Sequence, residues 1–259
     1  MTAADPALTD ALRRLADRPS VLVALDFDGV LAPIVEEPSA ARALPEASRA
    51  VADLAAQDGV TVALVSGRAL TDLRSVADPP DDVVLVASHG AEVAGAPGPE
   101  VPREVLDRVV AGLEAVAAQH PGTAIEHKPA AAVLHTRRAA RDVAADATRA
   151  ALEAAGAVEG AHVLQGKEVV EVSVVEADKG TALLALADRL GVDAVLYAGD
   201  DVTDEHAFEA VAGRGVDADV TVKVGDGDTA AAYRVASPDA FCAALTTLLS
   251  FRRGVAPQR

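Results

Sequence analysis

Two aspartates stand two positions apart directly after a run of five apolar residues. The run is VLVAL, residues 21–25, and the aspartates are Asp26 and Asp28. Successive side chains of a strand point to opposite faces, so Asp26 and Asp28 share one face if the strand continues through them. A desolvated carboxylate is costly unless a cation or a proton compensates its charge. The spacing therefore raises the question of which chemistry keeps two acids at the end of an apolar strand.

A second acidic cluster follows another apolar run, AVLYA at residues 194–198. It consists of Asp200 and Asp201 in the sequence GDD, with Asp204 close behind. Either cluster alone also fits an ordinary strand end that meets a turn. If the two runs are neighbouring strands, however, carboxylates about 4 Å apart repel by about 4 kcal/mol at an effective dielectric near 20. A cation would relieve this repulsion, and oxygen ligands without His or Cys favour Mg²⁺.

Together the clusters indicate covalent phosphoryl transfer. A cation keeps Asp26 ionised and nucleophilic, whereas Asp28, shielded from the metal and partly desolvated, can hold a proton. One carboxylate would attack phosphorus to form an aspartyl phosphate. The other would protonate the departing alkoxide and then activate water.

The phosphate also needs hydrogen-bond donors. Ser66 offers a hydroxyl, and Gly67 lets backbone amides approach an anion. Lys179 begins an amphipathic helix whose N-terminus favours anions. Taken alone, Ser66 also fits a turn-capping serine and Lys179 a solvated surface lysine. Their places relative to the two aspartate clusters favour the phosphate-binding interpretation.

The elements that must position these residues alternate along the chain. Four apolar runs, residues 21–25, 60–65, 83–87 and 194–198, are separated by alanine-rich segments with helical spacing. Such runs suit strands buried on both faces of a parallel sheet that helices cover. The pattern predicts a Rossmann-like, doubly wound α/β core. Each run ends in polar residues, and ligands bind at the carboxyl ends of such strands.

The middle of the chain differs from this pattern. After the Gly/Pro-rich stretch AGAPGPEVP come helix-like segments at 104–119 and 139–155, with short strand-like pieces between and after them. The last piece, EVVEVSV, alternates as a sheet with one exposed face does. We expect residues 1–95 with 177–259 to form the catalytic core, and residues 96–176 to form a smaller inserted α+β cap domain.

Composition narrows the functional classes. The 259 residues are 51% hydrophobic, and 23 Lys and Arg stand against 40 Asp and Glu, a net charge of −17. This charge disfavours nucleic acid and anionic membranes as partners. The single cysteine, Cys242, excludes an internal disulfide and fits a reducing compartment. No apolar run is long enough to cross a bilayer and no leader pattern opens the chain, so we expect a cytoplasmic protein.

These residues resemble a known pattern. DFDGVL at 26–31, Ser66, Lys179 and GDD with Asp204 resemble the four motifs of haloacid dehalogenase-like phosphatases. The longer signals VSGR, SHGAE, IEHK, GKEVVEV and GDDVTDEHAF resemble the trehalose-6-phosphate phosphatase family within that superfamily. The resemblance covers roughly residues 20 to 250. It implies a Mg²⁺-dependent hydrolysis of trehalose 6-phosphate to trehalose and phosphate, with an inserted cap.

The resemblance also implies roles for the core residues. Asp26 would be the nucleophile and a magnesium ligand, and Asp28 the acid/base that lends its backbone carbonyl to the metal. Asp200 would be the third protein ligand, while Asp201 and Asp204 would ligate through water or orient the lysine. The phosphoryl oxygens would be held by Ser66, Gly67 and Lys179.

For the sugar, the resemblance implies contacts from charged side chains, which recognise hydroxyls by charge-assisted hydrogen bonds. The expected contacts are Arg68, Glu126, Lys128, Lys167 and Glu171, with His89, Glu92 and Arg137 as weaker candidates. Glu126 and Lys128 also fit a surface ion pair of little energetic value. Two departures from the family pattern are Val30, where relatives often have Thr, and Thr136, where they often have Tyr.

Other interpretations stay open. The same chemistry could serve another sugar phosphate, such as sucrose 6-phosphate, and only the cap residues speak against this. A non-catalytic module, either a receiver-type phosphoacceptor or a silent regulatory phosphatase domain, is the alternative of another class. A trehalose-phosphate synthase is a possible partner. The segment 225–238 could close one side of the site or be an ordinary loop.

Overall fold

The computed structural model describes residues 5–95, 100–166 and 168–254. The chain divides into two compact units, and each is treated by itself below. The first unit is Met1–Ala96 with Ala177–Arg259, and the second is Pro97–Glu176. The Gly/Pro-rich stretch AGAPGPEVP thus lies where the chain leaves the first unit.

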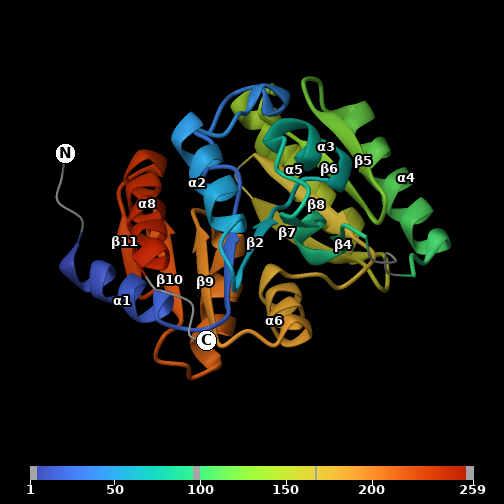
Figure 1. Ribbon diagram of the computed structural model, residues 1–259. Coiled ribbons are helices and arrows are strands. Elements are labelled where there is room, and N and C mark those ends of the chain that lie inside the picture. The colour runs from blue at the N-terminus through green and yellow to red at the C-terminus, as the bar shows by residue number, and fades with distance from the viewer. Residues whose placement is uncertain (1–4, 96–99, 167, 255–259) are drawn as a thin grey trace. The chain divides into compact units, whose positions relative to one another are not determined.

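The first unit is built on one sheet. Among the described residues its seven strands have the order β11-β10-β9-β1-β2-β3-β4 (Figure 1). Neighbouring strands pair in parallel except β4, which is antiparallel to β3. The bounds are β1 Val21–Leu25, β2 Val60–Val65, β3 Val84–Ala87, β4 Glu92–Val93, β9 Ala194–Gly199, β10 Val220–Val224 and β11 Tyr233–Val235.

Helices cover both faces of this sheet, which confirms the expected doubly wound α/β class. Their bounds are α1 Pro6–Ala16, α2 Pro45–Ala55, α3 Leu70–Ala77, α6 Lys179–Leu190, α7 Glu205–Gly213 and α8 Pro238–Gly254, with the short 3₁₀ turns η1 Pro38–Ala40, η2 Ser88–Gly90 and η3 Val202–Asp204. One hydrophobic cluster joins α1, α2, α3 and α8 to the sheet, and a second joins α6 and α7 to its other face.

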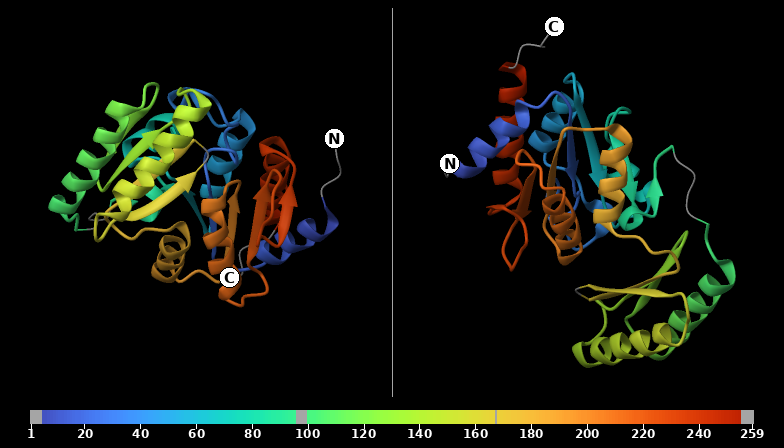
Figure 2. Two further views of the ribbon diagram at one scale, coloured as in Figure 1. Left: turned by 180° about the vertical axis from the view of Figure 1, so that it is seen from behind. Right: turned by 90° about the horizontal axis from the view of Figure 1, so that it is seen from below.

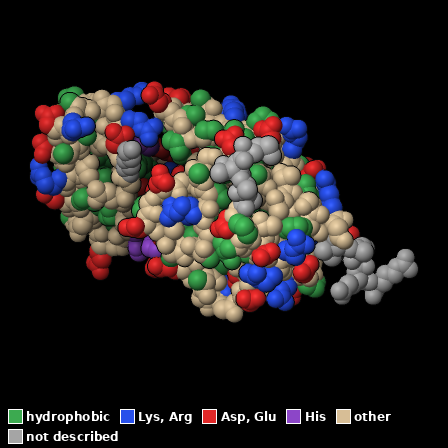
Figure 3. Space-filling view, turned by 90° about the vertical axis from the view of Figure 1, so that its left-hand side faces the viewer, with side chains coloured by type: hydrophobic (Ala, Val, Ile, Leu, Met, Phe, Trp, Pro, Cys, Tyr) green, Lys and Arg blue, Asp and Glu red, His purple; other side chains and the backbone are tan. Residues whose placement is uncertain are grey.

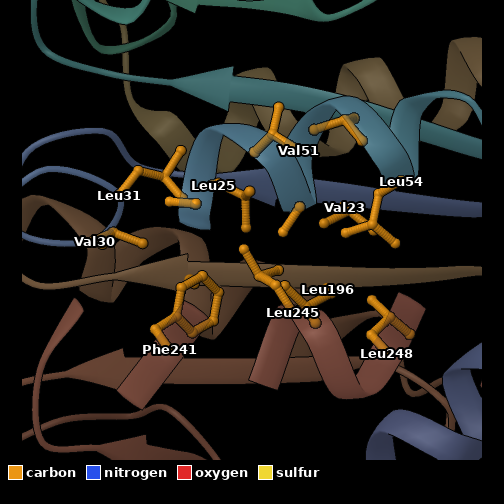
Figure 4. Packing of buried hydrophobic residues seen from close by; sticks show 14 of the residues in the cluster. Val23, Leu25, Val30, Leu31, Val51, Leu54, Leu196, Phe241, Leu245 and Leu248 are labelled. Atoms are coloured by element: carbon orange, nitrogen blue, oxygen red, sulfur yellow. The ribbon is translucent and has the colours of Figure 1, made fainter. Parts of the chain in front are cut away.

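Strand β1 shows why the core forms. All five of its residues are buried, because alternate side chains serve the two clusters. Val23 and Leu25 point toward Val51 of α2 and Leu245 of α8, as Figure 4 shows. Leu22 and Ala24 belong to the cluster on the other face. A strand buried on both faces needs a continuous apolar run, and VLVAL supplies one.

The second unit is a separate α+β layer. Its described strands form an antiparallel sheet of order β5-β6-β8-β7, and α4 and α5 cover one face of it (Figure 2). The bounds are α4 Arg103–Gln119, β5 Ala124–Lys128, β6 Ala131–His135, α5 Arg141–Gly156, β7 His162–Gly166 and β8 Val169–Ser173. Alternation along β8 directs Val170 and Val172 toward the helices and leaves Glu171 on the opposite face.

Charged side chains cover much of the surface. On the face that Figure 3 shows, carboxylates and cationic side chains are interspersed, with hydrophobic side chains scattered among them. Among the helices of the described residues, none combines the length and the apolar character that a bilayer span requires.

Candidate active site

The carboxyl ends of three neighbouring strands position the candidate site. In the sheet register, Leu25 of β1 lies beside Leu64 of β2 and Ala198 of β9. Asp26 follows β1 directly, and its amide donates to the carbonyl of Ala198 at 2.9 Å. Ser66 follows β2 in the same way. Asp26 and Ser66, which are 40 positions apart in the chain, therefore meet at the carboxyl ends of the strands.

Lys179 lies between two carboxylates in the interior of the first unit. Its Nζ donates to Asp26 Oδ2 and to Asp204 Oδ1, both at 2.8 Å, and its side chain is 2% exposed. The lysine is the first residue of α6, and Asp178 caps that helix by accepting from the Thr181 amide. Burial disfavours the ammonium, but Asp26 and Asp204 outweigh this and raise the pKa of Lys179. It stays protonated at neutral pH.

Asp204 is fully buried, and its two oxygens accept four hydrogen bonds. Oδ1 accepts from Lys179 and from the Tyr197 hydroxyl at 2.7 Å, and Oδ2 accepts from the amides of Asp200 and Asp201 at 2.9 Å. Burial opposes ionisation, yet these partners keep the pKa of Asp204 below its usual value. A carboxylate has about four acceptor positions, so these four hydrogen bonds use all of them. Asp204 therefore holds the loop that carries Asp200 and Asp201.

Three carboxylates crowd around the single ammonium. Asp26, Asp200 and Asp204 each offer an oxygen within 4.8 Å of the others. Burial raises the pKa of Asp26 well above its ordinary value, although Lys179 opposes this rise. Burial and the nearby Asp204 likewise raise the pKa of Asp200 to about 7. The cluster thus carries more carboxylates than Lys179 balances, and a cation would relieve their mutual repulsion.

The donor set fits a divalent cation with hard-ligand preferences. Asp26 and Asp200 supply carboxylate oxygens, and one or two carboxylates with open positions for water and phosphate suit Mg²⁺. Two glycines leave the space that the Asp200 and Asp204 carboxylates occupy. A side chain on Gly29, whose φ is +75°, would collide with the Asp200 carboxylate, and one on Gly199 would collide with Asp204.

Asp28 is held apart from this cluster. Arg68 donates through Nε to Asp28 Oδ2 at 2.6 Å and through Nη2 to Oδ1 at 2.8 Å. The same guanidinium donates to Asp72 at 2.6 Å and to the carbonyl of Pro38 at 2.9 Å. In this structure Arg68 thus contacts Asp28, the expected acid/base, together with one residue of α3 and one of the turn η1.

Ser66 and Gly67 lie at the end of β2, with Ser66 buried. The Ser66 hydroxyl accepts from the Arg68 amide at 3.2 Å, and the His89 ring packs so closely over Gly67 that any side chain there would overlap it. Ser88 and His89 both have positive φ, an unusual conformation for non-glycine residues. The weaker candidates His89 and Glu92 therefore belong to a tight turn beside Gly67, in which Ser88 donates to Glu92 at 2.5 Å.

Asp201 caps the turn η3, where its side chain accepts from the Val202 amide. Among the described residues, Lys179 donates to Asp204 and not to Asp201. Of these two residues, each expected to ligate through water or to orient the lysine, Asp204 thus contacts Lys179, and Asp201 donates its amide to Asp204.

The second unit brings several predicted residues to the sheet face opposite its helices. Lys128 donates to Glu171 at 2.7 Å, and both side chains are largely buried. His135 lies 2.9 Å from Glu126, and this contact lowers the pKa of Glu126. A more exposed pair, Arg137 with Glu168, lies 3.3 Å apart. Lys167 is outside the described residues.

Two residues near the cluster were not predicted from the sequence. Tyr197 looks like any apolar residue of a buried strand, and its hydrogen bond to Asp204 follows only from the fold. Lys223 lies in β10, a strand that the sequence analysis did not anticipate, and reaches the loop that carries Asp200. The feature of the sequence that distinguishes Lys223 is that lysine is rare in this chain.

The fold is the haloacid dehalogenase-like fold, as two solved structures show. A haloacid dehalogenase-like hydrolase from B. subtilis has this fold, with a TM-score of 0.60, 16% identity, and coverage of 87% of this chain and 98% of that one. The trehalose-6-phosphate phosphatase C-terminal domain of C. albicans matches with a TM-score of 0.81 at 22% identity, over 96% of this chain and 99% of that one.

The sequence comparisons identify the family. The family model described as trehalose-phosphatase matches residues 24–239. A trehalose-phosphate phosphatase of Mycobacterium marinum is 37% identical over 252 residues, which cover 89% of this chain and 63% of the relative. The chain belongs to the trehalose-phosphatase family, which confirms the resemblance stated above. It spans 63% of the length of the M. marinum relative and 19% of the length of an uncharacterized glycosyl hydrolase of Mycobacterium tuberculosis, which is 37% identical over 92% of this chain.

Proposed function

We propose that this chain hydrolyses trehalose 6-phosphate to trehalose and inorganic phosphate with the help of Mg²⁺. The observation that carries the proposal is the buried Lys179, which bridges Asp26 and Asp204 beside Asp200 in a chain of the trehalose-phosphatase family. A silent regulatory relative would not need this costly constellation. Asp26, Asp28, Lys179 and Asp200 are all present.

In the proposed reaction, an Asp26 oxygen attacks phosphorus and the bond from phosphorus to the sugar oxygen breaks. Asp28 gives its proton to the departing alkoxide, so that free sugar leaves and an aspartyl phosphate remains. Asp28 then takes a proton from a water that attacks the same phosphorus. The phosphate leaves and Asp26 is regenerated.

The residues around Asp26 support this sequence of steps. Lys179 and the Ser66 hydroxyl would hold the equatorial phosphoryl oxygens, and amides near Gly67 would add donors. Asp26 and Asp200, with the Asp28 carbonyl, would hold Mg²⁺. The metal would supply positive charge that neutralises the phosphoryl group and keeps Asp26 ionised.

For the sugar, we propose that Glu126, Lys128 and Glu171 hydrogen-bond hydroxyl groups. The pair Lys128 and Glu171 supports this, because a largely buried ion pair orients both groups and costs more desolvation than a surface pair. Lys167 stays a predicted contact. For Arg68 we propose a second role, the orientation of Asp28, because its guanidinium donates to both oxygens of that carboxylate. A cytoplasmic location and a synthase partner also stay predictions.

The test compares phosphate release from trehalose 6-phosphate, sucrose 6-phosphate and glucose 6-phosphate. Wild type and Asp26→Asn are assayed with Mg²⁺ and after chelation. The proposal expects a strong preference for trehalose 6-phosphate, lost in the variant and on chelation. Activity on another ester alone would keep the chemistry and reject the sugar assignment, whereas no release from any ester would favour a regulatory role.

A further inference from the structure

We propose that Lys223 is a positioning residue of the metal-binding loop, which holds the backbone of Asp200 and Asp201 so that the Asp200 carboxylate faces Asp26. This inference rests on the proposed function, because it assigns Asp200 to the metal. It concerns a residue that lies outside the motifs from which the family resemblance was drawn.

The first observation is the use of cations in this chain. It contains 19 arginines and four lysines, and the lysines are Lys128, Lys167, Lys179 and Lys223. The described lysines are each placed among carboxylates or carbonyls, whereas arginines supply most surface cations. An ammonium is a compact charge with three donors, and an arginine fork does not replace it where space is short. Lys223 therefore occupies a place that calls for a lysine.

The second observation is where Lys223 lies. It is 4% exposed, and its Cα pairs with Gly199, the residue just before Asp200. Its Nζ donates to the carbonyl of Asp200 at 2.8 Å and approaches the carbonyl of Asp201 at 3.4 Å. A buried lysine is unfavourable unless its charge is compensated, so these two carbonyls help to stabilise the ammonium of Lys223 in the interior.

Both the amides and the carbonyls of Asp200 and Asp201 have hydrogen-bond partners. The amides of Asp200 and Asp201 donate to Asp204, and the carbonyls of the same two residues face Lys223. With donors and acceptors both held, the backbone position from which the Asp200 side chain starts is fixed. Partners that orient metal ligands in this way contribute to metal affinity without touching the metal.

Glu205 supplies the countercharge and extends the network. Its Oε1 lies 3.5 Å from Lys223 Nζ, and its Oε2 accepts from the Ala230 amide at 2.7 Å and the Thr229 hydroxyl at 3.1 Å. The contacts therefore join β10, the Asp200 loop, the start of α7 and the loop before β11. Lys223 has the charge compensation that a buried ammonium needs.

The test replaces Lys223 by methionine, which keeps the stem and removes the donors. Mg²⁺ binding alone is measured by calorimetry, and phosphate release from trehalose 6-phosphate is measured against Mg²⁺ concentration. We expect the Mg²⁺ dissociation constant of Lys223→Met to rise about 10- to 100-fold. At saturating Mg²⁺, kcat and the KM for the ester should stay within about threefold of wild type.

The matched control is Thr221→Val on the same face of β10. The Thr221 hydroxyl accepts from the Ala232 amide at 2.8 Å, and in the described part of the chain it makes no hydrogen bond to Asp200. It should leave Mg²⁺ binding unchanged. If Lys223→Met does not fold, Lys223→Arg is used instead, because it keeps a cation beside Glu205. Its Mg²⁺ affinity should fall several-fold, because the planar guanidinium fits the two carbonyls poorly.

Unchanged Mg²⁺ affinity in the folded Lys223 variants would overturn the inference, as would an equal loss in Thr221→Val. Both results leave the proposed function intact. If wild type binds Mg²⁺ and Lys223→Met loses that binding while no ester is hydrolysed, the positioning role holds and the proposed function fails. The calorimetric result thus separates the two.

Discussion

Arg68 binds both carboxylate oxygens of Asp28, through Nε at 2.6 Å and through Nη2 at 2.8 Å. Paired, parallel contacts of this kind fix the plane of the carboxylate as well as its position. Asp72 and the Pro38 carbonyl fix the guanidinium in turn. The group expected to move protons therefore has its direction set by its neighbours, independently of the cluster around Lys179.

We predict that Arg68→Lys lowers kcat on trehalose 6-phosphate by on the order of 100-fold, because a misplaced catalytic group costs about that much. Lysine keeps the charge and loses the paired geometry. Steady-state kinetics across Mg²⁺ concentrations check this. A large rise in KM with unchanged kcat would instead support the direct sugar contact that the sequence predicts for Arg68.

We predict that Lys179→Met lowers kcat by roughly 100- to 1,000-fold and destabilises the metal-free protein by about 3–5 kcal/mol at pH 7. Removing one partner of a buried ion pair leaves the carboxylates of Asp26 and Asp204 uncompensated. Urea unfolding in the presence of a chelator measures the stability loss. Arg149→Met, which removes exposed ion pairs on α5, should leave the unfolding midpoint in place. Equal effects of the two substitutions would contradict the prediction.

Gly29→Ala is predicted to weaken Mg²⁺ binding at least about tenfold, because the new methyl group would displace the Asp200 carboxylate. The control is Gly191→Ala at the end of α6, where φ is +63° and no atom lies within 4 Å of an added Cβ. Both substitutions impose a left-handed conformation on alanine and cost about 1–2 kcal/mol of stability. Calorimetry with Mg²⁺ should separate them, and identical affinities would show that the collision is relieved without moving Asp200.

The stability of the metal-free protein should fall as pH rises from 5 to 8. The pKa of Asp200 is raised from 3.8 to about 7, so the folded state binds more protons than the unfolded state in this window. Under that condition the free energy of unfolding decreases with increasing pH, here by on the order of 2 kcal/mol. Urea unfolding with a chelator measures it.

Two controls accompany the pH series. Asp200→Asn should make the pH dependence between 5 and 8 less steep, since it removes one of the two carboxyl groups of the cluster whose pKa burial raises. Added Mg²⁺ should restore stability at pH 8 in wild type, because the metal replaces the protons. A metal-free stability that rises through this window would contradict the raised pKa of Asp200.

Local patterns predicted the strands that are apolar at all or nearly all positions. The runs 21–25 and 60–65 match β1 and β2 to the residue, because burial on both faces demands such runs. Strand β10, with sequence VTVKV, was not anticipated. Its polar residues Thr221 and Lys223 are buried because other parts of the chain provide their partners, and a local pattern does not show those partners.

The segment 225–238, for which two interpretations were open, contains the edge strand β11. Arg234 of this strand donates to the carbonyls of Gly225 and Gly227, which closes the preceding loop on itself. The candidate site was predictable where residue type and order were enough, as for Asp26 and Lys179. The contact of Arg68 with Asp28 was not, since it depends on how α3 and the turn η1 place Asp72 and Pro38.

The order of the sheet has a consequence for biosynthesis. Strand β1 lies between β2, which follows it closely in the chain, and β9, which begins at residue 194 of the 259. Until β9 leaves the ribosome, one edge of the fully buried strand β1 has no partner, and such edges favour aggregation. The ion pair of Lys179 with Asp26 joins residues 153 positions apart. We therefore expect a nascent chain to acquire its reactive centre late, after the inserted unit has already been synthesised.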